Sequence, residues 1–140
     1  MPVDSVLEAS RNAMNYERLR MDAASRNIAG ANVPVAPGQS AMRWRVDGAN
    51  AAGAGDFADA VGAAPMSGSP VLGETEATVR EVYDPGHPMA GTDGMVRYPA
   101  VDMVQEMTTL MTASRGYEAN VRSFNFLRNM LLRAIEIGAK

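Results

Sequence analysis

The fold is decided by residues 101–140, VDMVQEMTTLMTASRGYEANVRSFNFLRNMLLRAIEIGAK, which contain no proline and, before Gly138, a single glycine, Gly116. Apolar residues recur there at alternating steps of four and three, which places them on one face of a helix. Asp102 can cap the start with Gln105 at the third helical position, and Gly138 marks the end. The pattern predicts a helix of about 37 residues, roughly 50–55 Å long. Its apolar stripe comprises Met103, Met107, Leu110, Tyr117, Val121, Phe124, Leu131 and Ile135, interrupted at Ser114 and Arg128.

The N-terminal stretch repeats this periodicity and predicts a second helix of about 25 residues. Ser5 and Glu8 have the spacing of a capping box, and Gly30 ends the pattern. The expected fold is therefore mainly α: two long terminal helices paired as a coiled-coil-like hairpin, with a small β-rich, Gly/Pro-rich insert. The stripe of the first helix comprises Val3, Leu7, Met14, Met21, Ala24 and Ile28, interrupted at Ser10 and Glu17.

The last helix also carries apolar residues away from this stripe. A pair of helices buries only one stripe on each, so a second apolar flank predicts contacts with other subunits or another chain. The flanking residues are Val104, Met111, Leu127, Met130, Ala134 and Ile137.

The middle of the chain has a different composition, which divides the sequence into helical residues 1–30, an insert at 31–99 and helical residues 100–140. Eleven of the 13 glycines and seven of the 8 prolines lie within 30–99, with eight acidic residues against four arginines. Strict alternation predicts a strand at 42–46, and further strands are predicted at 75–83 and 95–98, giving a module of three or four strands. The Ala/Gly-rich run at 50–65 predicts a loop, and Asp-Pro-Gly at 84–86 and Thr-Asp-Gly at 92–94 predict turns.

Composition excludes several functional classes. The net charge of −3 argues against a nucleic-acid surface, and the absence of cysteine excludes disulfides and thiolate metal sites. No run of about 18 apolar residues predicts a membrane span. The start, MPVDSVLEAS, has neither the basic nor the apolar region of a secretory signal.

The sequence offers no catalytic, cofactor-binding or metal-binding constellation, so we expect no enzyme and no cofactor. The single histidine, His87, lies in a proline-rich loop, where a solvated or structural role is the simpler interpretation. Gly53-Ala54-Gly55 lacks the strand, helix and lysine of a phosphate-binding loop. The acidic pairs Glu74/Glu76 and Asp56/Asp59 are interpreted as solvated surface charges.

The segment VDMVQEMTTLMTASRGYEANVRSFN resembles the shared C-terminal motif of bacterial flagellar axial proteins. There a hydrophobic-acidic start leads into an Arg-x-Tyr-Glu-x-Asn box, which corresponds here to Arg115, Tyr117, Glu118 and Asn120. The N-terminal segment RLRMDAASRNIAGANVP is similar to that family's Asn/Ala-rich box, with departures at Arg26, Gly30 and Val33. The segment VYDPGHPMAGTDGMVRYPAVD is similar to the region before the last helix in rod proteins of the FlgC, proximal-rod, type. The resemblance covers residues 3–34 and 79–138.

The resemblance implies a structural subunit of the flagellar basal-body rod. Such subunits are exported by the flagellar type III apparatus without a Sec signal peptide, and they polymerise through their terminal helices into a torque-transmitting tube across the periplasm. The implied partners are further copies of the chain, rod proteins of the FlgB, FlgF, FlgG and FliE types, and the export apparatus. The expected assembly interface comprises Leu7, Met14, Met21, Ile28, Met107, Leu110, Arg115, Tyr117, Glu118, Asn120, Val121, Phe124, Leu131 and Ile135.

Residues 115–120 give a more detailed expectation. Tyr117 lies on the stripe, so its ring should be buried against the first helix or a neighbouring subunit. Arg115 and Glu118 are three residues apart and can pair with each other or across subunits. Asn120 should point away from the stripe and bond to a neighbouring backbone.

Three other functions remain open from the sequence alone. The chain could be another flagellar axial protein of the FlgB type, or a helical adaptor with a decorative insert that forms a discrete complex. An enzyme acting on cell-wall material is weaker, because no carboxylate or metal constellation supports it.

Overall fold

The structure, a computed structural model, describes residues 2–47 and 69–138, with side chains from Leu7 onward. It contains two long helices, α1 (Pro2–Gly30) and α3 (Met103–Gly138), and two short β-hairpins between them. The first hairpin pairs β1 (Met42–Asp47) with β2 (Val71–Glu76), and the second pairs β3 (Val79–Tyr83) with β4 (Met95–Pro99). The predicted loop at 50–65 lies outside the described residues.

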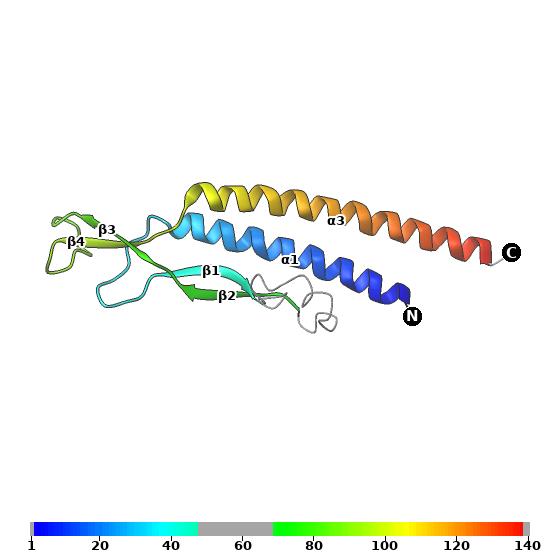
Figure 1. The fold of residues 1–140 in the computed structure, drawn as a ribbon, viewed down its shortest axis with the longest axis horizontal. Coiled ribbons are helices and arrows are strands. Elements are labelled where there is room, and N and C mark those ends of the chain that lie inside the picture. Colours follow the sequence, from blue (N-terminus) through cyan, green and yellow to red (C-terminus); the bar gives the residue numbers. More distant parts are fainter. Residues whose placement is uncertain (1, 48–68, 139–140) are drawn as a thin grey trace, which may run out of the picture.

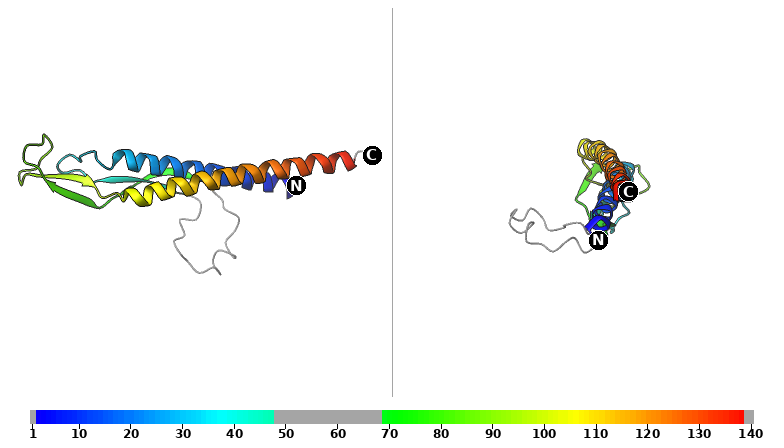
Figure 2. Two further views of the ribbon diagram at one scale, coloured as in Figure 1. Left: turned by 90° about the horizontal axis from the view of Figure 1, so that it is seen from above. Right: turned by 90° about the vertical axis from the view of Figure 1, so that its right-hand side faces the viewer.

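The two helices run antiparallel, side by side, and form an elongated molecule (Figures 1 and 2). The β1–β2 hairpin lies alongside α1, while the β3–β4 hairpin projects from the end opposite the two termini (Figure 1). At the other end α3 extends beyond the start of α1. The expectation of a mainly α fold with a small β insert is confirmed.

The helix ends follow from capping chemistry. Asp102 Oδ1 accepts hydrogen bonds from the backbone N–H groups of Val104 (2.9 Å) and Gln105 (3.1 Å), which satisfies two of the free donors at the start of α3, as predicted. The predicted capping box at Ser5 is wrong, because α1 already begins at Pro2. Proline suits the first turn of a helix, since its fixed φ is helical and its missing N–H would have had no partner there.

The predicted single strand at 75–83 is two strands, because the extended chain exchanges one partner for another in its middle. Ala77 N–H donates to Ala41 C=O on the β1 side (2.8 Å), whereas Thr78 C=O accepts from Ala100 N–H on the β4 side (2.8 Å). Successive residues of a strand direct their backbone groups to opposite edges, so β1 and β4 lie on opposite sides of this run. The strand predictions at 42–46 and 95–98 agree with β1 and β4.

The covered face of α3 contains most of the predicted stripe, but it also includes residues that the stripe left out. Glu106 and Ala113 are buried, whereas Met107 is half exposed. Small residues explain this difference, because Ala113 and Gly116 let the backbone of α3 approach α1 closely. The covered positions are Met103, Glu106, Thr109, Leu110, Ala113, Ser114, Gly116, Tyr117, Asn120, Val121, Phe124, Leu127 and Leu131.

Gly116 marks one such close approach. A Cβ atom built at this position would lie 3.0 Å from Cδ of Glu17, whose carboxylate also pairs with Arg20 at 3.0 Å. The acidic residue that interrupts the stripe of α1 therefore packs over the one glycine inside α3.

We predict that Gly116→Ala stabilises the protein only when Glu17 is shortened. Alanine in a helix interior is favoured over glycine by about 0.5–1 kcal/mol, but the added methyl group displaces the Glu17 side chain in the native background. In a Glu17→Ala background the full gain should appear in denaturant unfolding. An equal gain in both backgrounds would show that the two residues are not in contact.

Candidate functional site: a polar junction and an exposed apolar helix end

A buried asparagine joins the two helices and the first strand. Asn27 of α1 is 4% exposed, and its side-chain Oδ1 accepts from Trp44 N–H at 2.7 Å while its Nδ2 donates to Trp44 C=O at 2.9 Å. The amide thus bonds to both backbone groups on the outer edge of β1, as a neighbouring strand would. The same Nδ2 also donates to Oε1 of Glu106 on α3, at 3.2 Å.

Glu106 is a buried carboxylate with two partners. It is 8% exposed, and its Oε1 accepts from Asn27 and, at 3.4 Å, from Nη2 of Arg43 on β1. An unpaired carboxylate at this depth would be strongly disfavoured, so the amide and the guanidinium hold it in place. One side chain from each of α1, β1 and α3 therefore meets at this junction.

Stacking adds a second attachment of β1 to α1. The guanidinium of Arg26 lies 4.6 Å from the centre of the Trp44 ring, within the range of a cation–π interaction. Arg26 also pairs with Asp22 one turn earlier, at 3.0 Å. Consecutive residues of α1 thus contact the ring and the backbone of the same tryptophan.

Sequence reasoning missed this junction. Asn27 and Glu106 are polar residues on otherwise apolar helical faces. Each lies three positions after an apolar residue of the predicted stripe, Ala24 or Met103, and this spacing is the only signal in the sequence that could have located them. The partner of Asn27 is a backbone 17 positions away, which no side-chain pattern reveals.

The predicted interface residues divide into two groups. Those on the covered sides of the helices are half buried, and four positions on α3 are exposed: Met107, Arg115, Glu118 and Ile135. The half-buried set comprises Leu7, Met14, Met21, Ile28, Leu110, Tyr117, Asn120, Val121, Phe124 and Leu131.

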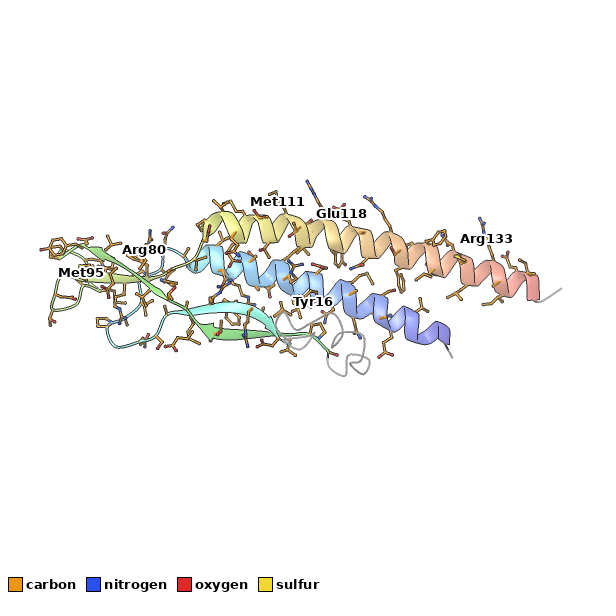
Figure 3. The ribbon with its side chains drawn as sticks, in the orientation of Figure 1. Tyr16, Arg80, Met95, Met111, Glu118 and Arg133 are labelled. Carbon is orange, nitrogen blue, oxygen red and sulfur yellow. The ribbon has the colours of Figure 1, made fainter. Side chains whose placement is uncertain are left out.

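Within the chain, Glu118 pairs with Arg122 at 3.5 Å, one turn further along α3, rather than with Arg115. Pairing of Arg115 or Glu118 across subunits stays a prediction. The expectation that Asn120 points away from the stripe is wrong, because Asn120 is half buried like Tyr117 and Val121. Figure 3 shows Met111, Glu118 and Arg133 on the face of α3 turned away from α1.

The flank predicted to need further partners is largely exposed along the whole of α3, from Val104 at 74% to Ile137 at 78%. Leu127 is the exception, because it lies on the covered face. Exposed apolar side chains that cluster in this way typically mark an interaction surface. The large exposed residues of α3 are Val104, Met107, Met111, Phe126, Met130, Leu132, Ile135 and Ile137.

Comparison with known proteins identifies the family. The family model described as the C-terminal region of the flagellar basal body rod FlgEFG proteins matches residues 92–137. The flagellar basal-body rod protein FlgC of Escherichia coli O157:H7 is 30% identical over 145 residues, covering 99% of each chain. FlgC of Bacillus subtilis strain 168 is 32% identical over 143 residues, covering 94% of this chain and 95% of that protein.

The chain belongs to the FlgC family of flagellar basal-body rod proteins. The segment matched by the family model contains Glu106, Gly116 and nearly the whole of α3. Within the described residues, no helix of this FlgC-family chain is apolar over a length sufficient to cross a bilayer, and no three acidic or histidine side chains are grouped as for a metal ion.

We predict that Asn27→Ala lowers the free energy of unfolding by about 2–4 kcal/mol, because it leaves the backbone of Trp44 and the carboxylate of Glu106 without this partner. Asn32→Ala, at an exposed position just after α1, is the matched control and should change it by less than about 0.5 kcal/mol. Trp44 is the single tryptophan, so its fluorescence during urea unfolding reports on the junction directly. Equal stabilities of the two variants would contradict the proposed role of the amide.

Proposed function

We propose that this chain is a structural subunit of the proximal part of the flagellar basal-body rod, and that it assembles through its terminal helices into the torque-transmitting tube. The observation that carries the assembly proposal is the exposed apolar end of α3. Membership of the FlgC family supports the location in the basal body. A rod protein is a structural component, so we propose no catalytic activity and no cofactor.

The free end of α3 extends beyond the chain's own first helix. The helix continues past the start of α1 (Figures 1 and 2), where Ile137 is 78% exposed. In the register set by the Asn27–Glu106 and Glu17–Gly116 contacts, Phe126 still lies beside α1, and its side chain is nevertheless 65% exposed. Burying apolar surface yields about 25 cal/mol per Å², so several such side chains give a neighbour a substantial gain on contact. Within the described residues, this apolar surface of α3 stays uncovered and is available to a neighbouring subunit.

The proposed interface consists of the predicted residues together with the exposed side chains at the end of α3. Residues facing α1 set the hairpin, for which the 3-4 spacing of the covered positions supports knobs-into-holes packing of the coiled-coil type. Residues on the outward side would contact neighbouring subunits. A rod is an open assembly, so this surface would have to meet a different surface of the neighbouring subunit, because repeated heterologous contacts that do not close build a helical tube.

The proposed partners are copies of the same chain, neighbouring rod proteins of the FlgB, FlgF, FlgG and FliE types, and the flagellar type III export apparatus. The location would be the rod where it crosses the periplasm, reached without a Sec signal peptide. Immunolabelling of isolated basal bodies tests this location. A helical adaptor would instead be recovered in a discrete complex outside the basal body.

We predict that Phe126→Glu abolishes incorporation into the rod and motility while leaving the fold intact. The side chain is exposed, so the free energy of unfolding should change by less than about 0.5 kcal/mol. Leu110→Asp, which faces α1, should instead cost several kcal/mol, because it buries an unpaired charge. The amount of protein in isolated basal bodies and denaturant unfolding of the purified chain distinguish the two effects.

Asn32→Glu is the control, because Asn32 is an exposed polar position after α1 and outside both helices. It should incorporate normally and support swimming. Normal motility of the Phe126→Glu variant would show that the end of α3 is not an interface.

A further inference from the structure

A cleft lies where α1, β1 and the first turns of α3 meet. Its volume is about 190 Å³, enough for one or two side chains of a partner. Three guanidinium groups and two aromatic rings line it, against one carboxylate, although the whole chain has a net charge of −3. These lining residues are Tyr16, Arg20, Arg43, Trp44, Arg45 and Glu106.

The arginines retain most of their hydrogen-bonding capacity. Arg20 pairs with Glu17 at 3.0 Å, Arg45 with Asp47 at 2.7 Å and Arg43 with Glu106 at 3.4 Å. A guanidinium has five N–H donors, so among the described residues one carboxylate contact leaves several donors free on each arginine. The one carboxylate among the described lining residues already accepts two hydrogen bonds through its Oε1. The cleft therefore has the chemistry to bind an additional carboxylate.

The loop between β3 and β4 has the complementary chemistry. Residues 84–94, DPGHPMAGTDG, contain two aspartates and neither lysine nor arginine. Oδ1 of Asp84 accepts from Gly86 N–H at 3.2 Å and Oδ1 of Asp93 from Met95 N–H at 3.1 Å, which leaves each Oδ2 without a partner in the described part of the chain. Beside them Tyr83, 70% exposed, and Met89 are apolar groups suited to the rings in the cleft.

The loop of one chain does not reach its own cleft. The β3–β4 hairpin points away from the body of the molecule at the end opposite the termini, whereas the cleft lies beside α1 and β1 (Figure 1). A second copy displaced along the long axis would bring its hairpin alongside the helices of the first.

We propose that the arginine-lined cleft binds the acidic β3–β4 loop of a second copy of this chain, with Asp84 and Asp93 as the residues that enter it. This inference rests on the proposed assembly of copies into a rod. The contact joins two different surfaces, so it propagates from copy to copy along the axis instead of closing a dimer. Among the other exposed acids of the described insert, Glu81 on β3 pairs with Arg97 at 3.6 Å, whereas Glu74 and Glu76 on β2 are the alternative occupant.

The absence of cysteine allows a direct test by cross-linking. Thr92→Cys places a thiol in the loop next to Asp93, and Thr109→Cys places one in the wall of the cleft without removing an arginine. In intact flagellate cells a short bis-maleimide should join the two into intermolecular dimers and higher ladders, recovered in isolated basal bodies. Thr112→Cys, exposed on the same helix and outside the cleft, replaces Thr109→Cys in the control pair and should give at least about tenfold less product.

Charge removal then identifies the occupant. Asp84→Asn with Asp93→Asn keeps the turn acceptors but removes both charges, and should lower the cross-linked fraction about tenfold, the loss expected for one charge-assisted hydrogen bond. Glu74→Gln with Glu76→Gln is the matched control and should leave it unchanged. In a further pair, Glu74→Cys takes the place of Thr92→Cys. Cross-linking of Glu74→Cys to Thr109→Cys, without cross-linking of Thr92→Cys, would overturn the proposal that the loop occupies the cleft. Protein present in basal bodies without a cross-link would overturn the inference alone, whereas protein absent from basal bodies would overturn the proposed function.

Discussion

The arrangement of the molecule depends on the two hydrogen bonds between the Asn27 side chain and the backbone of Trp44. A two-stranded hairpin is marginally stable alone in water, and its exposed backbone edges attract other strands. Asn27 occupies the outer edge of β1 and fixes the hairpin on α1. The second hairpin is fixed in a comparable way, because Val35 N–H donates to Arg97 C=O on the outer edge of β4 at 2.7 Å. In each two-stranded sheet, backbone groups on one outer edge are therefore hydrogen-bonded by another part of the same chain.

Because Asn27 also reaches Glu106, the position of the hairpin is coupled to the register of the helices. A slip of α3 by one turn would move Glu106 about 5.4 Å from the amide and from Arg43, leaving a buried carboxylate without partners. Apolar contacts alone would tolerate such a slip better. The apolar residues of each helix recur every three or four positions, so after the slip each would meet an equivalent position of the partner helix. We infer that the polar junction selects the register, while Ala113 and Gly116 determine how closely the helices approach.

Helix periodicity predicted the larger part of this architecture, because long amphipathic helices repeat one signal many times. The strand at 75–83 was predicted as one element because no turn signal interrupts it, and only the tertiary hydrogen bonds of Ala77 and Thr78 divide it. At the start of α3 the stripe was assigned to Met107, because hydrophobicity favours Met107 over Glu106, whereas the buried hydrogen bonds favour Glu106. The junction at Asn27 was missed because its partner is a backbone, whose position depends on the fold.

The composition of the core explains why assembly should matter for this chain. Among the described residues, the fully buried apolar side chains are five alanines, at 23, 24, 31, 41 and 113, and Val96. Small side chains permit close helix packing but remove little apolar area from water, so the hydrophobic gain of the isolated chain is small. Eight large apolar side chains of α3 remain exposed instead. Their burial would supply stabilisation that the core does not, so the register set at Asn27 would be rigid only once neighbouring subunits cover α3.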